Sequence, residues 1–225
     1  MKRKEFLKKS LMGAGVITIL PMAASCSSDD DNGSDPSNCD VTPTEIAGPF
    51  PIMTPAQQVQ ANIIGNRNGI ALQINFTIQK KTTCAPLSNV FVDLWQCDSR
   101  GNYSEYSGQE DGDFSNEDFL RGRQTTNAEG KVSFISIYPG WYPGRAPHLH
   151  LEVRDANENS LLITQVAFPE NISNSVYATT GYTGNFDTAN SNDLSFSNSL
   201  QDNLPDSITG DNTNGYVYNK IITVA

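Results

Sequence analysis

The segment KVSFISIYPGWYPGRAPHLHLEV, residues 131–153, holds two runs in which apolar and polar side chains alternate. The runs cover residues 131–137 and 148–153, and their period of two is typical of β-strands, whose successive side chains point to opposite faces. Two Pro-Gly pairs lie between the runs and indicate sharp turns. The segment therefore predicts two strands joined by a structured loop.

The same alternation recurs along the rest of the chain. It is found at residues 70–78, 90–95, 161–168 and 216–224, and turn sequences such as NRNG, SRGN, NAEG and DANEN separate the runs. Residues 171–214 are rich in Ser, Thr, Asn, Asp and Gly, which predicts long loops with at most short helical turns. We expect an all-β fold, a single β-sandwich domain of mostly antiparallel strands with long loops.

The first 26 residues have the pattern of an export signal. A basic opening, MKRKEFLKKS, precedes the apolar run LMGAGVITILPM, which is too short to span a bilayer, and small residues precede Cys26. This pattern resembles a lipoprotein signal peptide that ends at a lipidated Cys26. The string RKEFLK is similar to a twin-arginine motif with Lys4 in place of the second arginine, so the export route stays open.

The residues after Cys26 divide into a tether and a domain. Residues 27–38, SSDDDNGSDPSN, contain no apolar side chain and predict a disordered acidic tether, and residues 39–225 form the predicted domain. We therefore expect an exported protein that is lipid-anchored to the cell envelope, on its periplasmic or cell-surface side.

The charge of the chain limits its partners. The first 26 residues contain five of the 15 basic side chains and one of the 25 acidic ones, so the remainder carries 10 against 24, a net charge of −14. Such a surface repels nucleic acid and disfavours electrostatic docking to anionic lipid. Membrane contact is therefore expected through the lipid anchor alone.

Three cysteines remain in the predicted domain. In an oxidising compartment, Cys39, Cys84 and Cys97 are expected to form one disulfide, and the sequence permits all three pairings. Small buried thiols are the alternative interpretation.

The only two histidines of the chain, His148 and His150, lie one residue apart on a predicted strand. Strand geometry places them on one face with Glu152, about 6 to 7 Å apart, which lets two imidazoles converge on a metal ion. Cu, Zn, Fe and Ni all accept imidazole, and a polar solvent-facing strand is the alternative.

Two tyrosines stand in turns that can bring them to these histidines. Tyr142 lies in PGWYPGR, just before the histidine strand, and Tyr103 follows a Gly-containing turn after residues 90–95. A phenolate is a hard donor, and a highly charged ion such as Fe(III) lowers its pKa from about 10. Arg145 could counter an anion at the metal. Two phenols and two imidazoles leave an open position for chemistry.

A family resemblance rests on these motifs together. The strings VFVDLWQCDSRGNYSEYSG, FLRGRQTTNAEGKVSFISIYPGWYPGRAPHLHLEV and LLITQVAF, with the opening CDVTPTEIAGPFPI, resemble the intradiol ring-cleavage dioxygenases. This family includes catechol 1,2-dioxygenase and protocatechuate 3,4-dioxygenase. The resemblance implies a β-sandwich with a metal between its two sheets. It also implies a non-haem Fe(III) ion held by Tyr103, Tyr142, His148 and His150.

The resemblance further implies an activity and its catalytic residues. The substrates would be a small aromatic diol and O2, both oxygen atoms entering a catechol-type ring to give a muconate-type diacid. Tyr142 would leave the metal and accept a substrate proton, Arg145 would stabilise negative charge on the bound ring, and Gln165 would lie near the substrate. Oligomeric state is not implied.

Two alternatives follow from the same residues. Glu152 shares a face with His148 and His150, which allows a two-histidine, one-carboxylate site for Fe(II), Zn or Cu. Alternatively, the protein is a non-catalytic surface lipoprotein whose sandwich binds carbohydrate or another ligand. Trp95 is interpreted as a packing residue rather than a platform for substrate.

Overall fold

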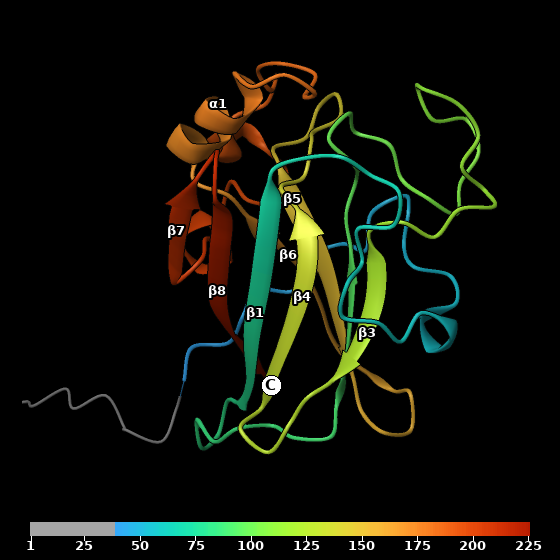
Figure 1. Ribbon diagram of the computed structural model, residues 1–225. Coiled ribbons are helices and arrows are strands. Elements are labelled where there is room, and N and C mark those ends of the chain that lie inside the picture. Colours follow the sequence, from blue (N-terminus) through green and yellow to red (C-terminus); the bar gives the residue numbers. More distant parts are fainter. Residues whose placement is uncertain (1–38) are drawn as a thin grey trace, which may run out of the picture. The chain divides into compact units, whose positions relative to one another are not determined.

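The computed structural model describes residues 39–225, so the predicted signal peptide with Cys26 and the predicted tether lie outside the described residues. The described part folds into two four-stranded sheets (Figure 1). The first sheet has the order β4 (Lys131–Ile137), β1 (Ala71–Lys80), β8 (Gly215–Val224), β7 (Ser207–Asp211). The second has the order β3 (Arg121–Thr125), β2 (Phe91–Trp95), β5 (His148–Arg154), β6 (Ser160–Ala167).

Strand pairing is antiparallel throughout both sheets, apart from the parallel pair β1 and β8. The prediction of an all-β sandwich with mostly antiparallel strands is confirmed. All six runs with alternating apolar residues form strands, within one or two residues of the expected ends.

Two strands lack the alternating pattern, and the sequence did not predict them. β3 has the sequence RGRQT, and its buried side chains are Arg121 and Arg123 rather than apolar residues. Arg123 is held by a bidentate ion pair with buried Asp93 on the neighbouring β2. β7 is an edge strand without a buried residue, so no apolar face marks it.

Helices are short and few in the described part of the chain. They are η1 (Pro55–Gln57), α1 (Glu170–Tyr177), η2 (Asn190–Asn192) and α2 (Leu200–Asn203). Three of them lie in the region where short helical turns were expected. None of the helices within residues 39–225 has the length and apolar character needed to cross a membrane.

The main hydrophobic core lies between the two sheets. Each sheet contributes side chains that are almost completely buried, including Ile74, Phe76 and Phe134 from the first and Leu94 and Leu151 from the second. Burying such a side chain contributes about 1.5 to 3 kcal/mol. Alternation on β5 therefore fixes the orientation of the whole strand, because its leucines must face this core.

The histidines consequently lie on the opposite face of β5. Leu149, Leu151 and Val153 join the core between the sheets, so His148 and His150 point to the outer face of the second sheet. The expectation of a metal between the two sheets is therefore wrong for this chain. The outer face is nevertheless buried, since both histidines are at most 2% exposed.

An N-terminal strap, residues 39–58, covers that outer face (Figure 1, blue). Its backbone bonds to both edges of the second sheet: Glu45 N donates to Ile163 O of β6 (3.0 Å), and Gln58 O accepts from Arg123 N of β3 (2.8 Å). The strap thus crosses the sheet from the β6 edge to the β3 edge and excludes water from the histidines.

A disulfide attaches the start of the strap to the body of the domain. It joins Cys39 to Cys84, which follows β1, and Cys97 is a buried free thiol. Of the three pairings that the sequence permits, the structure contains this one.

Candidate metal centre

Four side chains from three segments converge beneath the strap. Nε2 of His148 lies 3.0 Å from Nε2 of His150, and the phenol oxygen of Tyr142 lies 3.5 Å from Nε2 of His148. The ring of Tyr103 is 5.8 Å from that of Tyr142 and 6.1 Å from that of His150, centroid to centroid. The structure therefore brings together all four residues that the sequence suggested as ligands.

Each histidine is held by its neighbours. Nδ1 of His148 lies 2.6 Å from the carbonyl oxygen of Ala146, to which its N–H donates, so Nε2 keeps a lone pair facing the cluster. Across the β2–β5 pair, Trp95 stands opposite His150, and the two rings stack in parallel at 5.1 Å. Trp95 is a packing residue, as expected, but the ring that it packs against is His150.

The surroundings lower the pKa of both imidazoles, which favours their neutral form. Burial, followed by the positive charge of Arg145, lowers the pKa of His148 to about 3. Burial, followed by the neighbouring His148, holds the pKa of His150 well below its usual range. A neutral imidazole is the form that binds metals, so the cluster offers nitrogen donors without prior deprotonation.

Tyr103 supplies an orphaned oxygen. Its side chain is fully buried and stacks on Phe50 of the strap, with 4.9 Å between ring centroids, and its phenol oxygen has no hydrogen-bond partner within residues 39–225. Burial raises the pKa of Tyr103 well above its usual range. A buried polar group without a partner costs about 1 to 3 kcal/mol, which a bound cation would offset. This oxygen and the two imidazoles fit a hard, highly charged metal ion.

Tyr142 is the more accessible phenol. It is half-buried, and its oxygen accepts a hydrogen bond from Nη1 of Arg145 (3.2 Å). Burial raises the pKa of Tyr142, whereas the positive charge of Arg145 opposes that effect. The two phenols therefore differ in environment: one is enclosed and the other has a charged neighbour and access to solvent.

Arg145 is fixed by two further side chains. Its Nε donates to Oδ2 of Asp193 (2.9 Å), and its Nη2 donates to Oε1 of Gln165. The amide nitrogen of Gln165 donates to the carbonyl of Ile46 in the strap (2.6 Å). Gln165 therefore reaches the site through Arg145 and the strap.

Asp193 is a site residue that the sequence analysis missed. It is fully buried and also accepts a hydrogen bond from the backbone N–H of Ala146 (2.7 Å). Asp193 lies in the polar stretch 171–214, where acidic residues are frequent and composition indicates only loops. Nothing in the local sequence distinguishes it from its neighbours.

The alternative site with Glu152 is not assembled. Although Glu152 is on the outer face of β5, its carboxylate pairs with Arg154 (2.7 Å). Within residues 39–225, no three His, Cys, Asp or Glu side chains gather closely enough to hold a metal ion. The two-histidine, one-carboxylate interpretation is therefore wrong.

Comparison with known proteins places this chain in a family. A family model described as dioxygenase matches residues 49–180, more than half of the chain. The structure is similar to an intradiol ring-cleavage dioxygenase from Tetranychus urticae, with a TM-score of 0.73, 28% identity, and 83% of this chain and 95% of that chain covered. The chain belongs to the intradiol ring-cleavage dioxygenase family.

Two other relatives extend the comparison. The protocatechuate 3,4-dioxygenase beta chain of Burkholderia cepacia is 34% identical over 91 residues, which is 37% of this chain but only 39% of that relative. The dioxygenase domain of a dioxygenase carbohydrate-binding protein fusion from Streptomyces sp. SirexAA-E shares the fold. Its TM-score is 0.60 at 24% identity, with 82% of this chain and 97% of that chain covered.

Proposed function

We propose that this member of the intradiol family is a non-haem, Fe(III)-dependent dioxygenase. It would insert both atoms of O2 into a catechol-type ring and release a muconate-type diacid. The observation that carries the proposal is the convergence of two phenols and two buried imidazoles beside one fixed arginine. The family membership and the names of the relatives support the same reaction class.

The residues that would hold the iron are Tyr103, Tyr142, His148 and His150. Phenolate oxygen is a hard donor that suits a ferric ion, and imidazole completes the set. When bound, the ferric ion would make the catechol hydroxyls more acidic and withdraw electron density from the ring, which then becomes reactive toward O2.

The two phenols would have different tasks. Tyr103 is enclosed beneath Phe50 and would remain a permanent ligand. Tyr142 is half-buried and hydrogen-bonded to Arg145, so its oxygen can turn away as the diol enters and accept a proton from a substrate hydroxyl. The strap meanwhile excludes bulk water, which strengthens the electrostatic interactions within the site.

Arg145 would stabilise negative charge that develops on the bound ring. Its guanidinium lies beside Tyr142 and is held by Asp193 and Gln165, so little reorganisation is required during the reaction. Gln165 would act by holding Arg145 and the strap rather than by touching the ring.

We also propose that the protein is exported and anchored at the cell envelope through a lipidated Cys26. The Cys39–Cys84 disulfide supports this location, because such bonds persist in oxidising compartments. Labelling with a radioactive fatty acid tests the anchor: label is expected on the wild-type chain, and a label that persists in Cys26→Ala contradicts the proposal.

The visible absorption spectrum of the iron-loaded protein tests the function. We expect a broad phenolate-to-iron band that shifts when catechol is added without O2, followed by a muconate-type product once O2 is admitted. In Tyr103→Phe the band should lose at least about half its intensity, since one of two phenolate donors is gone. The matched control is Tyr138→Phe, because Tyr138 is equally buried but bonds to Ser173 outside the cluster. A protein that stays colourless after reconstitution with iron contradicts the proposal.

The strap provides a second test through Gly48. A Cβ at this position would lie 2.8 Å from Cε1 of His150, and Gly48 has a left-handed backbone with φ +74°. Gly108 has nearly the same backbone, φ +70°, but a Cβ there would have no atom of the described residues within 4 Å. Alanine at either position should lower the free energy of unfolding by about 1 kcal/mol, because a Cβ disfavours the left-handed backbone. Only Gly48→Ala should displace His150 and weaken iron binding, by about 10-fold or more.

Urea unfolding and iron titration of both variants separate these effects. Equal iron affinity in Gly48→Ala and Gly108→Ala would show that contact between the strap and His150 does not shape the centre.

A further inference from the structure

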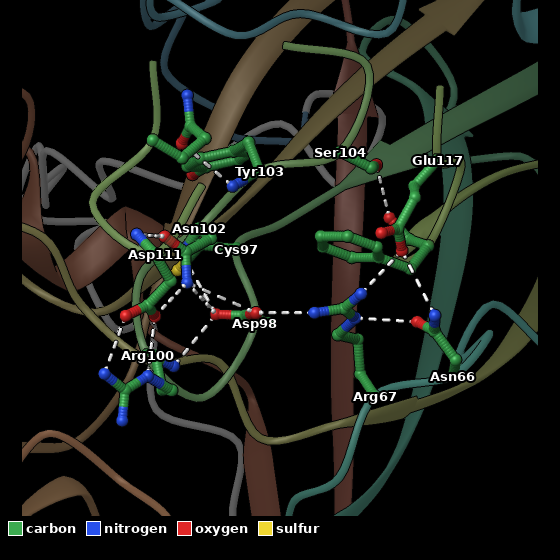
Figure 2. Close-up of polar contacts among 12 residues, drawn as sticks. Asn66, Arg67, Cys97, Asp98, Arg100, Asn102, Tyr103, Ser104, Asp111 and Glu117 are labelled. Carbon is green, nitrogen blue, oxygen red and sulfur yellow. Dashed lines mark hydrogen bonds and ion pairs between the residues drawn. The ribbon is translucent and has the colours of Figure 1, made fainter. Parts of the chain in front are cut away.

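The turn that precedes Tyr103 is organised by a buried carboxylate (Figure 2). Oδ1 of Asp98 accepts the backbone N–H groups of Arg100 (2.9 Å) and Asn102 (3.0 Å), and the N–H of Asp98 donates to the carbonyl of Asn102 (2.8 Å). Because Asn102 is the residue immediately before Tyr103, these bonds fix where the Tyr103 backbone leaves the turn.

The same turn occurs twice more in the part of the chain that the structure describes. Oδ1 of Asn127 accepts the N–H groups of Glu129 (3.1 Å) and Lys131 (2.8 Å). Oδ1 of Asp155 accepts those of Asn157 and Asn159, both at 2.8 Å. These turns lead from one strand to the next and carry no residue of the metal centre. Asn127 shows that a neutral amide oxygen is sufficient to form the turn.

The Asp98 turn differs from the other two in an additional backbone contact. The carbonyl of Asp98 accepts an N–H from within its own turn, that of Gly101 (3.1 Å), and also the N–H of Gly140 (3.0 Å). Gly140 is two residues before Tyr142, so Asp98 bonds both to the turn that leads to Tyr103 and to the turn that leads to Tyr142.

Glycines allow the two tyrosine turns to come this close. A Cβ on Gly101 would lie 2.4 Å from the carbonyl oxygen of Trp141, and a Cβ on Gly140 would lie 2.5 Å from that of Asp98. Any side chain at either position would force the turns apart. The separation of Tyr103 and Tyr142 is therefore set by direct backbone contact between their turns.

Charged side chains hold Asp98 from the other side. Nη1 of Arg67 lies 3.5 Å from Oδ2 of Asp98, and Arg67 is itself paired with Glu117 (2.5 Å; Figure 2). The side-chain amide of Asn102 donates to Oδ1 of Asp98 (3.3 Å) and to Asp111 (2.7 Å), which pairs with Arg100. The carboxylate of Asp98 is thus enclosed by partners, and none of them belongs to the metal centre.

We propose that Asp98 is a positioning residue that sets the two phenols, Tyr103 and Tyr142, at the distance and angle that the metal requires. The inference rests on the proposed function, since it takes both phenols as ligands. Asp98 acts on the metal only through the backbone of the two turns. Its Oδ1 shapes the turn before Tyr103, and its carbonyl oxygen bonds to Gly140 in the turn before Tyr142.

The test compares the visible band and the iron affinity of three variants with those of the wild type. Asp98→Ala removes the carboxylate, and we expect the band to shift and iron affinity to fall about 10- to 100-fold, as for other residues that orient ligands. Asp98→Asn should keep the wild-type band, because the amide oxygen of Asn127 forms the same turn elsewhere in the domain. Asp155→Ala is the matched control, since it removes the same pair of turn bonds at the far end of β5 and should leave the band unchanged.

A wild-type band that survives unaltered in Asp98→Ala overturns the inference alone and reduces Asp98 to a structural residue. A wild-type protein without the band overturns the proposed function, and this inference with it. If Asp98→Ala does not fold, Gly140→Ala separates the turns from the Tyr142 side with the carboxylate intact. An unshifted band in that variant also overturns the inference.

Discussion

Replacing Arg145 by methionine is expected to lower kcat for catechol cleavage by about 10²- to 10³-fold while iron stays bound. Methionine keeps much of the side-chain length but removes the charge beside Tyr142 and the donors to Asp193 and Gln165. A charge that stabilises the developing ring anion acts on the chemical step, so kcat should fall more than KM rises. The phenolate-to-iron band should persist, since Arg145 is not a ligand.

Arg154→Met is the matched control for this prediction. Arg154 ends β5 and pairs with Glu152 (2.7 Å) and Asp93 (3.4 Å), so its loss also breaks ion pairs on the same strand without touching the metal centre. Its kcat should stay within about twofold of the wild type, because charges this far from the site contribute little to the barrier. A kcat for Arg145→Met equal to that of Arg154→Met would remove Arg145 from the mechanism.

The removal of Arg145 also leaves the buried Asp193 without its ionic partner, and breaking a buried pair costs about 3 to 5 kcal/mol. Unfolding must therefore be measured alongside kcat. Asp193→Asn separates the two effects: it keeps Arg145 and its charge, removes the ion pair, and should lower kcat less than Arg145→Met does.

The sequence predicted the part of the site that a strand encodes. On β5 every second residue is apolar, and because those residues must enter the core, both histidines had to share the other face. The sequence did not predict that the histidines lie on the outer face of the second sheet rather than between the two sheets. Both faces of β5 are buried, so burial alone does not distinguish them. The strap that buries the outer face has no alternating apolar pattern from which its position could be predicted.

Residues that act through side-chain pairing left no periodic signal. β3 is buried through Arg121 and Arg123, whose partners are acids and carbonyls supplied by other segments of the chain. Asp193 reaches Arg145 across 48 positions from a loop of ordinary polar composition. Such contacts depend on how the loops fold back on the sandwich, and neither hydrophobic period nor turn chemistry contains that information.

A large effect on stability is expected from the Cys39–Cys84 disulfide. It closes a loop with a sequence separation of 45 residues, and in the chain-entropy account opening such a loop costs about 4 kcal/mol. A double variant with alanine at both positions should therefore unfold at markedly lower urea than the wild type. Dithiothreitol should lower the wild-type midpoint toward that of the double variant and leave the double variant unchanged. A wild-type midpoint that does not respond to reduction would show that the bond adds nothing to stability.

The same double variant should retain most of its activity. This result would show that the disulfide stabilises the fold but is not needed to keep the strap over the metal centre. Beyond Cys39, the strap is still tied to β6 by the bond from Glu45 N to Ile163 O (3.0 Å) and by the side chain of Gln165 to Ile46 O (2.6 Å). These bonds lie next to Gly48, the residue that packs on His150. Loss of the disulfide therefore destabilises the fold through the unfolded chain, whereas the native metal centre keeps its cover, and kcat should change by less than about twofold.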